Sequence, residues 1–320
     1  MTILVTGAAG FIGFHASRRL LARGERIVGL DSLTDYYDVA LKRARLTELD
    51  RQAGFEFHRL DLADDDAVKR LVLETRPTRI LHLAAQAGVR YSLDAPFAYT
   101  HSNVTGHLSV LEAARALGGD LAHLVYASSS SVYGERGGRF REDDALGEPV
   151  SLYAATKRAD ELMSSTYTHL YGLPQTGLRF FTVYGPWGRP DMAYFSFAEA
   201  MLRGETIRLF NEGRNQRDFT YIDDVIEPLV RVLDDAPGAR HGVYNIGGSN
   251  PVETLDLVAT LERALGVNAK TEPVPPQPGD VSYTCADVTR LERDYGCVPG
   301  TRLEEGIARF AQWFRSYRNS

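Results

Sequence analysis

A glycine-rich turn between an apolar strand pattern and a helical pattern is the feature that most constrains this chain. The apolar run Ile3–Thr6 leads directly into Gly7–Gly13 (GAAGFIG), which opens an amphipathic stretch. Glycines at such a turn allow close backbone approach to a pyrophosphate, which the following helix N-terminus attracts. Asp31 follows Gly13 by 18 residues, near the ~20 expected for a ribose-binding carboxylate. The pattern therefore predicts a dinucleotide site.

The first half of the chain alternates short apolar runs with amphipathic stretches, which predicts an α/β fold with a Rossmann-type, doubly wound parallel sheet. Strands are expected at Ile3–Thr6, Arg26–Leu30, Phe55–Asp61, Arg79–Leu83, His123–Ala127 and Gln175–Phe180. Helices are expected at Ile12–Arg23, Asp64–Thr75, Ala95–Leu117 and Ser151–Tyr171. After about Phe181 the pattern loosens, so we expect an NAD-binding domain over 1–180 and a smaller, mixed α/β substrate domain over 181–320. Some segments of the second are expected to return to the first.

Composition narrows the function. Lys and Arg number 36 against 42 Asp and Glu, a net charge of −6, which disfavours nucleic acid as a partner. No apolar run approaches the ~20 residues that span a membrane, and no signal-peptide pattern is present, so we expect a cytoplasmic protein. The two cysteines, Cys285 and Cys297, lack a metal-binding spacing, so no metal is expected. Asp31, Asp35 and Asp38 would repel a 2′-phosphate, which favours NAD over NADP.

Tyr153 and Lys157 form a Tyr-x-x-x-Lys pattern (YAATK) within a predicted helix. Residues i and i+4 share a helix face, so the Lys157 ammonium is expected near the Tyr153 phenol and a cofactor ribose. An ordinary phenol is only about one part in a thousand ionised at pH 7. A cation ~4 Å away at an effective dielectric of ~20 contributes roughly 4 kcal/mol, enough to bring a phenolate near working pH, as a general base requires.

A serine cluster, Ser128–Gly134 (SSSSVYG), follows the fifth predicted strand. Open α/β sheets bind their ligands at the carboxyl ends of the strands, so this cluster is expected to face a ligand. Further segments complete a pattern that spans nearly the whole chain. They are Asp61, Leu83–Ala85 (LAA), Asn103, Arg179–Pro186 (RFFTVYGP), Arg217–Asp224 (RDFTYIDD) and Gln277–Val281 (QPGDV).

With the Gly-x-x-Gly-x-x-Gly turn and the Tyr-x-x-x-Lys pair, these segments resemble the extended short-chain dehydrogenase/reductase family, specifically its NAD-dependent nucleotide-sugar epimerases and dehydratases. Three stretches resemble the UDP-glucuronate 4-epimerase subgroup: Ala84–Ser92 (AAQAGVRYS), Ser151–Lys157 (SLYAATK) and Arg179–Ala193 (RFFTVYGPWGRPDMA). The resemblance implies interconversion of UDP-glucuronic acid and UDP-galacturonic acid. The sugar would be oxidised at C4 to a 4-keto intermediate, rotated and reduced again with tightly bound NAD.

The resemblance also implies residue roles. Ser129, Tyr153 and Lys157 are expected to be catalytic. Cofactor-binding residues are expected to be Gly7, Gly10, Phe11, Ile12, Gly13, Asp31, Ser32, Asp61, Leu62, Leu83, Ala84, Ala85, Asn103, Tyr153, Lys157 and Tyr184. Substrate-binding residues are expected to be Arg90, Ser128, Ser129, Ser130, Thr182, Arg189, Arg217 and Asp280. Within this set, Arg189 suits the sugar carboxylate because its planar fork donates two parallel hydrogen bonds. A homodimer through the helices near 95–117 and 151–171 is also expected.

Alternatives remain open. A 4,6-dehydratase of this family carries Asp-Glu before the Val-Tyr-Gly, and a UDP-glucuronate decarboxylase carries Glu there, whereas this chain has Ser130 and Ser131. A UDP-hexose 4-epimerase would differ in the sugar that it accepts. The non-enzymatic alternative is a Rossmann-fold regulator that senses NAD, against which the intact Ser129, Tyr153 and Lys157 set argues.

Overall fold

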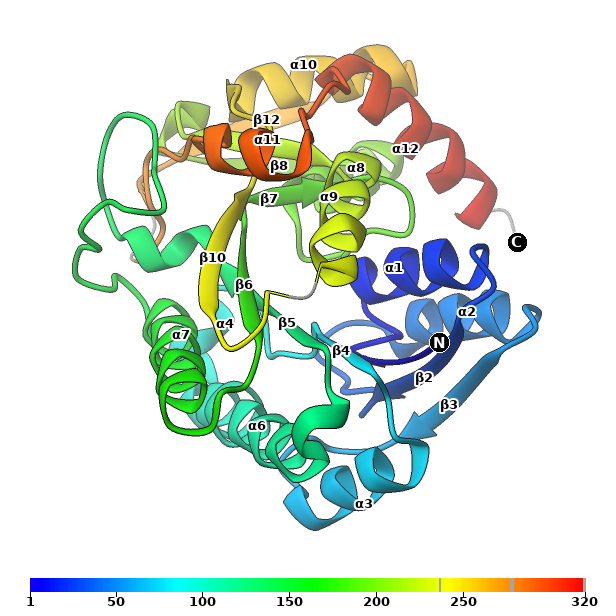
Figure 1. Ribbon diagram of the computed structural model, residues 1–320. Helices are drawn as coiled ribbons and strands as arrows, with labels where there is room; N and C mark the ends of the chain where they lie inside the picture. The colour runs from blue at the N-terminus through cyan, green and yellow to red at the C-terminus, as the bar shows by residue number, and fades with distance from the viewer. Residues whose placement is uncertain (236, 277–278, 319–320) are drawn as a thin grey trace. The chain divides into compact units, whose positions relative to one another are not determined.

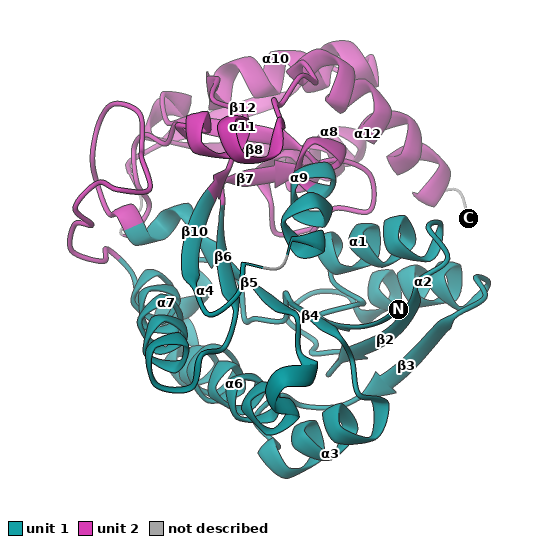
Figure 2. Ribbon diagram, viewed as in Figure 1, with its two compact units in different colours: residues 1–132, 151–179, 226–244 teal, residues 133–150, 180–225, 245–320 magenta. Residues whose placement is uncertain are grey.

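The predicted glycine-rich turn lies between strand β1 (Thr2–Thr6) and helix α1 (Phe11–Leu21) in a computed structural model, which describes residues 1–235, 237–276 and 279–318. The chain divides into two compact units, coloured separately in Figure 2. Unit 1 comprises residues 1–132, 151–179 and 226–244, and unit 2 comprises residues 133–150, 180–225 and 245–320. Each unit thus draws on three separate segments of the sequence.

A seven-stranded sheet organises unit 1 (Figure 1). Its strand order is β10-β6-β5-β4-β1-β2-β3, and the pairs from β5 to β3 are parallel, with Val5 of β1 opposite Gly29 of β2 and Leu81 of β4. This order confirms the predicted doubly wound sheet. The strands are β2 (Arg26–Asp31), β3 (Phe55–Arg59), β4 (Arg79–His82), β5 (His123–Ser129), β6 (Gln175–Phe180) and β10 (His241–Ile246).

Helices cover both faces of this sheet, as Figure 1 shows. One face carries α3 (Asp65–Thr75), α6 (Gly106–Leu117) and α7 (Leu152–Tyr171), whose apolar side chains form one buried core with β1, β2, β4 and β5. The other face carries α1, α2 (Val39–Asp50) and the end of α9 (Ile222–Asp234). Arg23 of α1 pairs with Asp234 of α9 at 2.7 Å. The helices of unit 1 therefore cover the two faces of the sheet and leave the ends of its strands uncovered within this unit.

The helix expected at Ala95–Leu117 is confirmed from Pro96 onward, but its middle is a π-helical turn. It comprises α5 (Pro96–Tyr99), the π-helical turn η1 (Thr100–Thr105) and α6, and the short helix α4 (Tyr91–Asp94) precedes it. Ala95 leaves the helical region, with φ −127° and ψ 61°, because a residue before proline is sterically excluded from it. π-helical turns are rare and gather at functional sites, and this one holds Asn103.

Unit 2 contains two small sheets and four helices among its described residues. One sheet has the order β11-β9-β7 and the other pairs β12 with β8. These strands are β7 (Thr182–Tyr184), β8 (Thr206–Phe210), β9 (Gln216–Tyr221), β11 (Pro251–Glu253) and β12 (Lys270–Val274). The helices are α8 (Ala193–Arg203), α10 (Thr254–Leu265), α11 (Thr289–Tyr295) and α12 (Leu303–Arg318). An aromatic cluster joins α8 to α12, with the rings of Tyr194 and Phe310 centred 4.9 Å apart.

Candidate functional site

The turn after β1 is shaped by glycine. Gly7 has a φ of +71°, and its N–H donates to the Leu30 carbonyl at 2.7 Å. A Cβ on Gly7 would lie 2.8 Å from the Ala84 nitrogen, and one on Gly13 would lie 2.1 Å from the Gly7 carbonyl oxygen. Gly10 is the N-cap of α1 and offers no side chain to its first N–H groups. The backbone therefore stays open at a helix N-terminus, the arrangement that binds pyrophosphate.

Two carboxylates follow the second and third strands. Asp31 is buried at the end of β2 and accepts hydrogen bonds from the backbone N–H groups of Ala9 (3.2 Å) and Leu33 (2.8 Å). Asp61 is exposed after β3 and contacts the His101 ring at 3.0 Å. The predicted neighbours Ser32 and Leu62 are half-buried and buried, respectively, and Phe11 and Ile12 begin α1.

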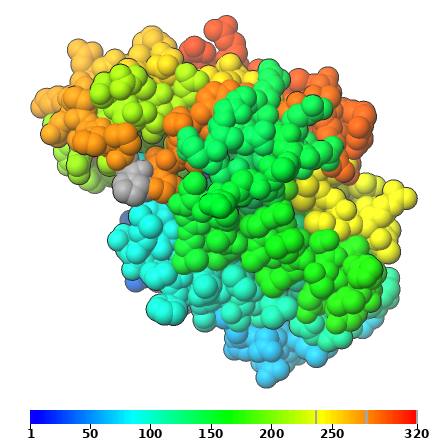
Figure 3. Space-filling view, turned by 90° about the vertical axis from the view of Figure 1, so that its left-hand side faces the viewer, coloured from blue at the N-terminus to red at the C-terminus, as the bar shows by residue number. Residues whose placement is uncertain are grey.

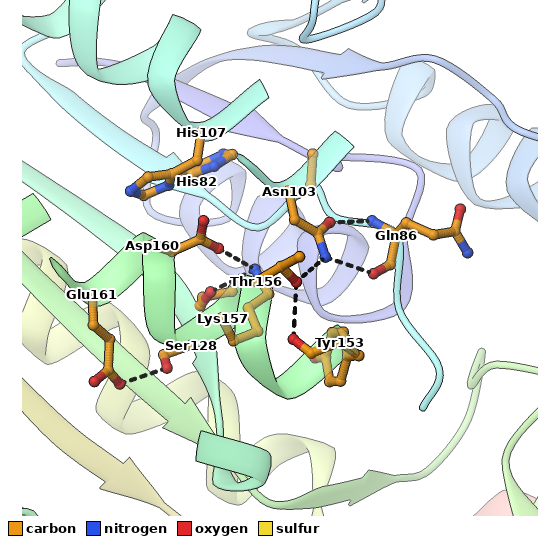
Figure 4. A network of polar contacts seen from close by, with 12 residues as sticks. His82, Gln86, Asn103, His107, Ser128, Tyr153, Thr156, Lys157, Asp160 and Glu161 are labelled. Atoms are coloured by element: carbon orange, nitrogen blue, oxygen red, sulfur yellow. Dashed lines mark hydrogen bonds and ion pairs between the residues drawn. The ribbon is translucent and has the colours of Figure 1, made fainter. Parts of the chain in front are cut away.

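Asn103 fixes the loop that follows β4. Its amide oxygen accepts from the Gln86 N–H at 2.8 Å, and its amide nitrogen donates to the Gln86 carbonyl at 3.1 Å and to the Thr156 hydroxyl at 3.0 Å (Figure 4). Earlier in this segment, the Ala84 N–H donates to the Thr6 hydroxyl at 3.1 Å. The predicted Leu83, Ala84 and Ala85 are thereby held beside the glycine turn. Gln86 and Thr156 lie within the quoted stretches Ala84–Ser92 and Ser151–Lys157, but the sequence assigned no role to either residue.

The geometry of these segments fits NAD. The glycine turn follows β1, and the buried Asp31 ends the neighbouring strand β2. The strand order reverses between β1 and β4, whose following loop is the one that Asn103 fixes. Open α/β sheets bind dinucleotides at this switch point.

The serine cluster ends β5 and begins a 3₁₀ turn, Ser130–Tyr133. Successive residues of a strand point to opposite faces, and the structure separates Ser128 from Ser129 accordingly. The Ser128 hydroxyl donates to Glu161 of α7 at 2.7 Å, whereas the Ser129 hydroxyl lies 3.1 Å from that of Ser131. The Ser128 hydroxyl is therefore engaged by Glu161 of α7, whereas the Ser129 hydroxyl is not.

Tyr153 and Lys157 lie one turn apart near the start of α7. The helix begins after Ser151, whose hydroxyl accepts from the Ala154 N–H at 3.1 Å. The Lys157 ammonium donates to the Ala127 carbonyl of β5 at 3.0 Å and to Asp160 at 3.0 Å. Tyr153 is half-buried, while Lys157 is buried. The structure thus ties the lysine to the strand that carries the serines, and Asp160 is a contact that the sequence motifs did not reveal.

A second buried ion pair, between Arg179 and Glu161, contacts Ser128. Arg179 of β6 donates two hydrogen bonds to Glu161, at 2.8 and 2.9 Å. Burial alone raises the pKa of Glu161, but the Arg179 hydrogen bond and charge outweigh it and hold that pKa below its ordinary value. Glu161 is therefore an ionised acceptor for Ser128.

The remaining predicted residues lie mostly in unit 2, where they form two ion pairs. Arg189 pairs with Asp191 through two contacts, at 3.0 and 2.5 Å, in the loop after β7, which begins at Thr182. Arg217 of β9 pairs with Asp280 at 2.8 Å. Gln277 and Pro278 of the expected QPGDV segment lie outside the described residues.

Two predicted residues lie apart from these groups. Tyr184 is buried among aromatic rings of unit 2, with Tyr221 centred 5.7 Å away. Arg90 is exposed where α4 begins, in unit 1. Within the described ranges, no cluster of three His, Cys, Asp or Glu side chains is placed to hold a metal, and no helix is long and apolar enough to cross a membrane.

Comparison with known proteins identifies the family. Residues 3–247 match the NAD dependent epimerase/dehydratase family, and the chain belongs to it. It is 46% identical to UDP-glucuronate 4-epimerase 4 of Arabidopsis thaliana, over 99% of this chain and 76% of that protein. It is 45% identical to a probable UDP-glucuronate 4-epimerase of Rhizobium meliloti, over 100% and 99%. The crystal structure of UDP-glucuronic acid 4-epimerase from Bacillus cereus, in complex with UDP-glucuronic acid and NAD, matches with a TM-score of 0.93, 34% identity and coverage of 99% and 100%.

Proposed function

We propose that this chain is an NAD-dependent epimerase that interconverts UDP-glucuronic acid and UDP-galacturonic acid. The observation that carries the proposal is the fixed Lys157 ammonium, held by Ala127 of β5 one helical turn from Tyr153. The same strand ends at Ser129, so the proposed base, cation and hydroxyl would lie together at the carboxyl end of the sheet. The relatives named UDP-glucuronate 4-epimerase, which match nearly this whole chain, support the choice of sugar.

Unit 1 would hold the cofactor and unit 2 the nucleotide sugar. The turn Gly7–Gly13 would take the pyrophosphate, and Asp31 would accept hydrogen bonds from the adenosine ribose. The other cofactor contacts of this unit would come from Ser32, Asp61, Leu62, Leu83, Ala84, Ala85, Asn103, Tyr153 and Lys157. Bound NAD would supply the hydride acceptor for C4 and return the hydride to the other face of the sugar.

Residues of unit 1 would transfer the proton of the sugar hydroxyl. Tyr153 would remove the proton from O4 of the sugar as C4 is oxidised and give it back after the 4-keto sugar has turned over. Lys157 would stabilise the phenolate by its charge, and Ser129 would hold O4 by a hydrogen bond. Because the proton leaves and returns in each turnover, Tyr153 must act as both base and acid.

The sugar carboxylate would be held by Thr182 and Arg189, with Ser130 beside it. A short hydroxyl at Thr182 leaves room for a carboxylate, and the two contacts to Asp191 fix the plane of the Arg189 guanidinium. Arg217 would bind the diphosphate, with Arg90 as a further contact. Asp280 would approach the uridine ribose.

A decarboxylase is the nearest alternative, since a 4-keto uronic acid loses CO₂ readily when the C5–C6 bond aligns with the carbonyl π system. Ser131, directly before Val132, is half-buried and makes a hydrogen bond with Ser129. It supplies no carboxylic acid at that place. We therefore favour the epimerase, in which the carboxylate stays charged and hydrogen-bonded.

We also propose a cytoplasmic homodimer. On α6 and α7, which pack against each other in unit 1, Leu108, Leu162, Leu170 and Tyr171 are exposed apolar side chains. Figure 3 shows α7, in green, at the centre of one face of the molecule. A second copy covering this face would remove those side chains from water.

A product assay without added cofactor tests the proposed activity. The purified protein is incubated separately with UDP-glucuronate, UDP-glucose and UDP-xylose, and the nucleotide sugars are separated. We expect UDP-galacturonate from the first and little conversion of the others. Conversion of UDP-glucose at a rate equal to that of UDP-glucuronate would assign the chain to the hexose epimerases instead.

A further inference from the structure

Asp160 is a buried carboxylate that contacts Lys157 directly (Figure 4). The Asp160 carboxylate lies 3.0 Å from the Lys157 ammonium, and the two residues are 0% and 2% exposed. The second carboxylate oxygen, Oδ1, is buried and has no hydrogen-bond partner in the described chain. An unpaired buried polar atom is costly, and buried ion pairs add little stability over apolar residues of the same size. Stability alone therefore does not account for a carboxylate at this position.

The groups around Asp160 come from every element packed against it. Lys157 and Glu161 on α7, His107 on α6 and Tyr126 on β5 interact with Asp160 itself. His82 on β4 faces Lys157, and Arg179 on β6 and His241 on β10 face Glu161. Burial and then neighbouring positive charge lower the pKa of His82 and His107, that of His107 to about 3, so both rings are neutral at physiological pH. Arg179 is already paired with Glu161. Lys157 is therefore the cation that faces Asp160.

Under the proposed function, the Asp160–Lys157 pair would set the charge that acts on Tyr153. An ammonium alone favours the phenolate, whereas a carboxylate 3.0 Å behind that ammonium cancels part of its field. Under the proposed function, Tyr153 must also return its proton, so a phenolate that is stabilised too strongly would slow the second half of the reaction. A carboxylate paired with Lys157 would moderate the stabilisation of the phenolate, so that Tyr153 can both remove and return the proton.

We propose that Asp160 is a positioning residue that acts through Lys157: it holds the ammonium against β5 and limits how strongly that charge stabilises the Tyr153 phenolate. The proposal rests on the proposed function for its catalytic meaning. Burial raises the pKa of Asp160 to about 6 against the opposing effect of Lys157, so the carboxylate is mostly charged at pH 7 and loses its charge as the pH falls below about 6. The compensation is therefore strongest above that pH.

The test is a phenolate titration of the holoenzyme by ultraviolet difference absorbance, with wild type and Asp160→Asn each compared with its own Tyr153→Phe counterpart. The absorbance change of each protein minus that of its Tyr153→Phe counterpart reports the ionisation of Tyr153 alone. Asparagine keeps an acceptor for Lys157 but removes the charge, so we expect the midpoint to fall by about one pH unit. The acid limb of kcat/KM should shift in the same direction. Asp160→Ser serves for the same comparison if Asp160→Asn does not fold.

Three comparisons separate the outcomes. Asp160→Glu keeps the charge and should restore the wild-type midpoint, and Asp120→Asn, which removes an exposed carboxylate, should leave it unchanged. Coincident titrations of wild type and Asp160→Asn, with only a loss of thermal stability, would overturn the proposal. A shifted titration in a protein that does not convert UDP-glucuronate would instead leave the pairing intact and refute the proposed function.

Discussion

The peptide unit of Ala9 joins the glycine turn to Asp31: its N–H donates to the Asp31 carboxylate at 3.2 Å. The carbonyl of the same residue accepts a hydrogen bond from the buried Arg45 guanidinium of α2 at 2.9 Å. The turn that would receive a pyrophosphate and the carboxylate that would receive a ribose are thus fixed to each other before any ligand binds. Preorganisation of this kind lowers the cost of binding.

Gly13→Ala tests the turn. The new Cβ would lie 2.1 Å from the Gly7 carbonyl oxygen, so the backbone must move. Overpacking of this kind costs roughly 1–3 kcal/mol, and a cost of this size in the NAD-bound state would lower NAD affinity by about 5-fold to about 150-fold. NAD released by acid from the purified protein measures the effect. Gly119→Ala, whose Cβ would meet nothing within 4 Å, should retain the wild-type content, and an equal loss in both variants would contradict this reading.

Tyr153→Phe tests the proposed base. The ring remains but the oxygen that transfers the proton is lost, and general acid–base catalysis is typically worth ~10²–10⁴-fold. We expect kcat to fall by at least ~10² while binding of UDP-glucuronate, measured by calorimetry, changes little. A variant that retains more than half of the wild-type turnover would show that another residue is the base.

Arg189→Ala tests recognition of the carboxylate. Removing one partner of a desolvated charge pair typically costs ~2–5 kcal/mol, so kcat/KM for UDP-glucuronate should fall by roughly 30-fold or more. The loss for UDP-glucose should be smaller. Arg214→Ala is the matched control, because Arg214 is an exposed arginine of the same unit, 3.0 Å from Glu212. Equal losses on both sugars would place Arg189 outside the carboxylate site.

The buried histidines predict loss of stability in acid. The pKa of His107 is lowered to about 3, mainly by burial, against about 6.5 in the unfolded chain, so unfolding takes up a proton between these values. The free energy of unfolding contributed by this group is complete above pH 6.5 and is lost as the pH falls towards 3. The slope is at most about 1.4 kcal/mol per pH unit for one histidine.

Denaturant unfolding between pH 4.5 and 7.5 measures this slope. His107→Gln keeps a polar group for Ser164, which lies 2.9 Å from the His107 ring, but glutamine cannot take up a proton. The slope of its free energy of unfolding against pH should therefore be smaller than that of wild type by the contribution of about one proton. Asp160 contributes with the opposite sign, because its raised pKa favours the folded state at low pH. The exposed His169→Gln should leave the slope unchanged. A slope that is equal in His107→Gln and wild type would contradict the account.

The sequence predicted those elements whose pattern is local. The β1–turn–α1 unit follows from a buried apolar run and three spaced glycines, and β6 has the predicted bounds because Gln175–Phe180 is continuously buried. The helix predicted at Ala95–Leu117 is confirmed from Pro96 onward, but its π-helical turn was not predicted, because the contacts of Asn103 with Gln86 and Thr156 are long-range.

The ion pairs of the site were not predicted. Asp160 was not predicted because an acidic residue three positions after a lysine is commonplace on exposed helices, and its burial beside His107 arises only in the folded unit. Asp280 and Arg217 were predicted separately as substrate contacts, yet they bind each other across 63 positions of the sequence. Long-range pairs of this kind are set by tertiary packing, not by spacing.

The most direct test of the proposed activity follows a deuterium at C4 of UDP-glucuronate, with no cofactor added. Because oxidation and reduction would occur at the same carbon of a sugar that stays bound, we predict UDP-galacturonate that retains the label at C4 and has the mass of the substrate. A product lighter by CO₂ would assign the chain to the decarboxylases, and loss of the label to water would contradict transfer to and from a bound nicotinamide.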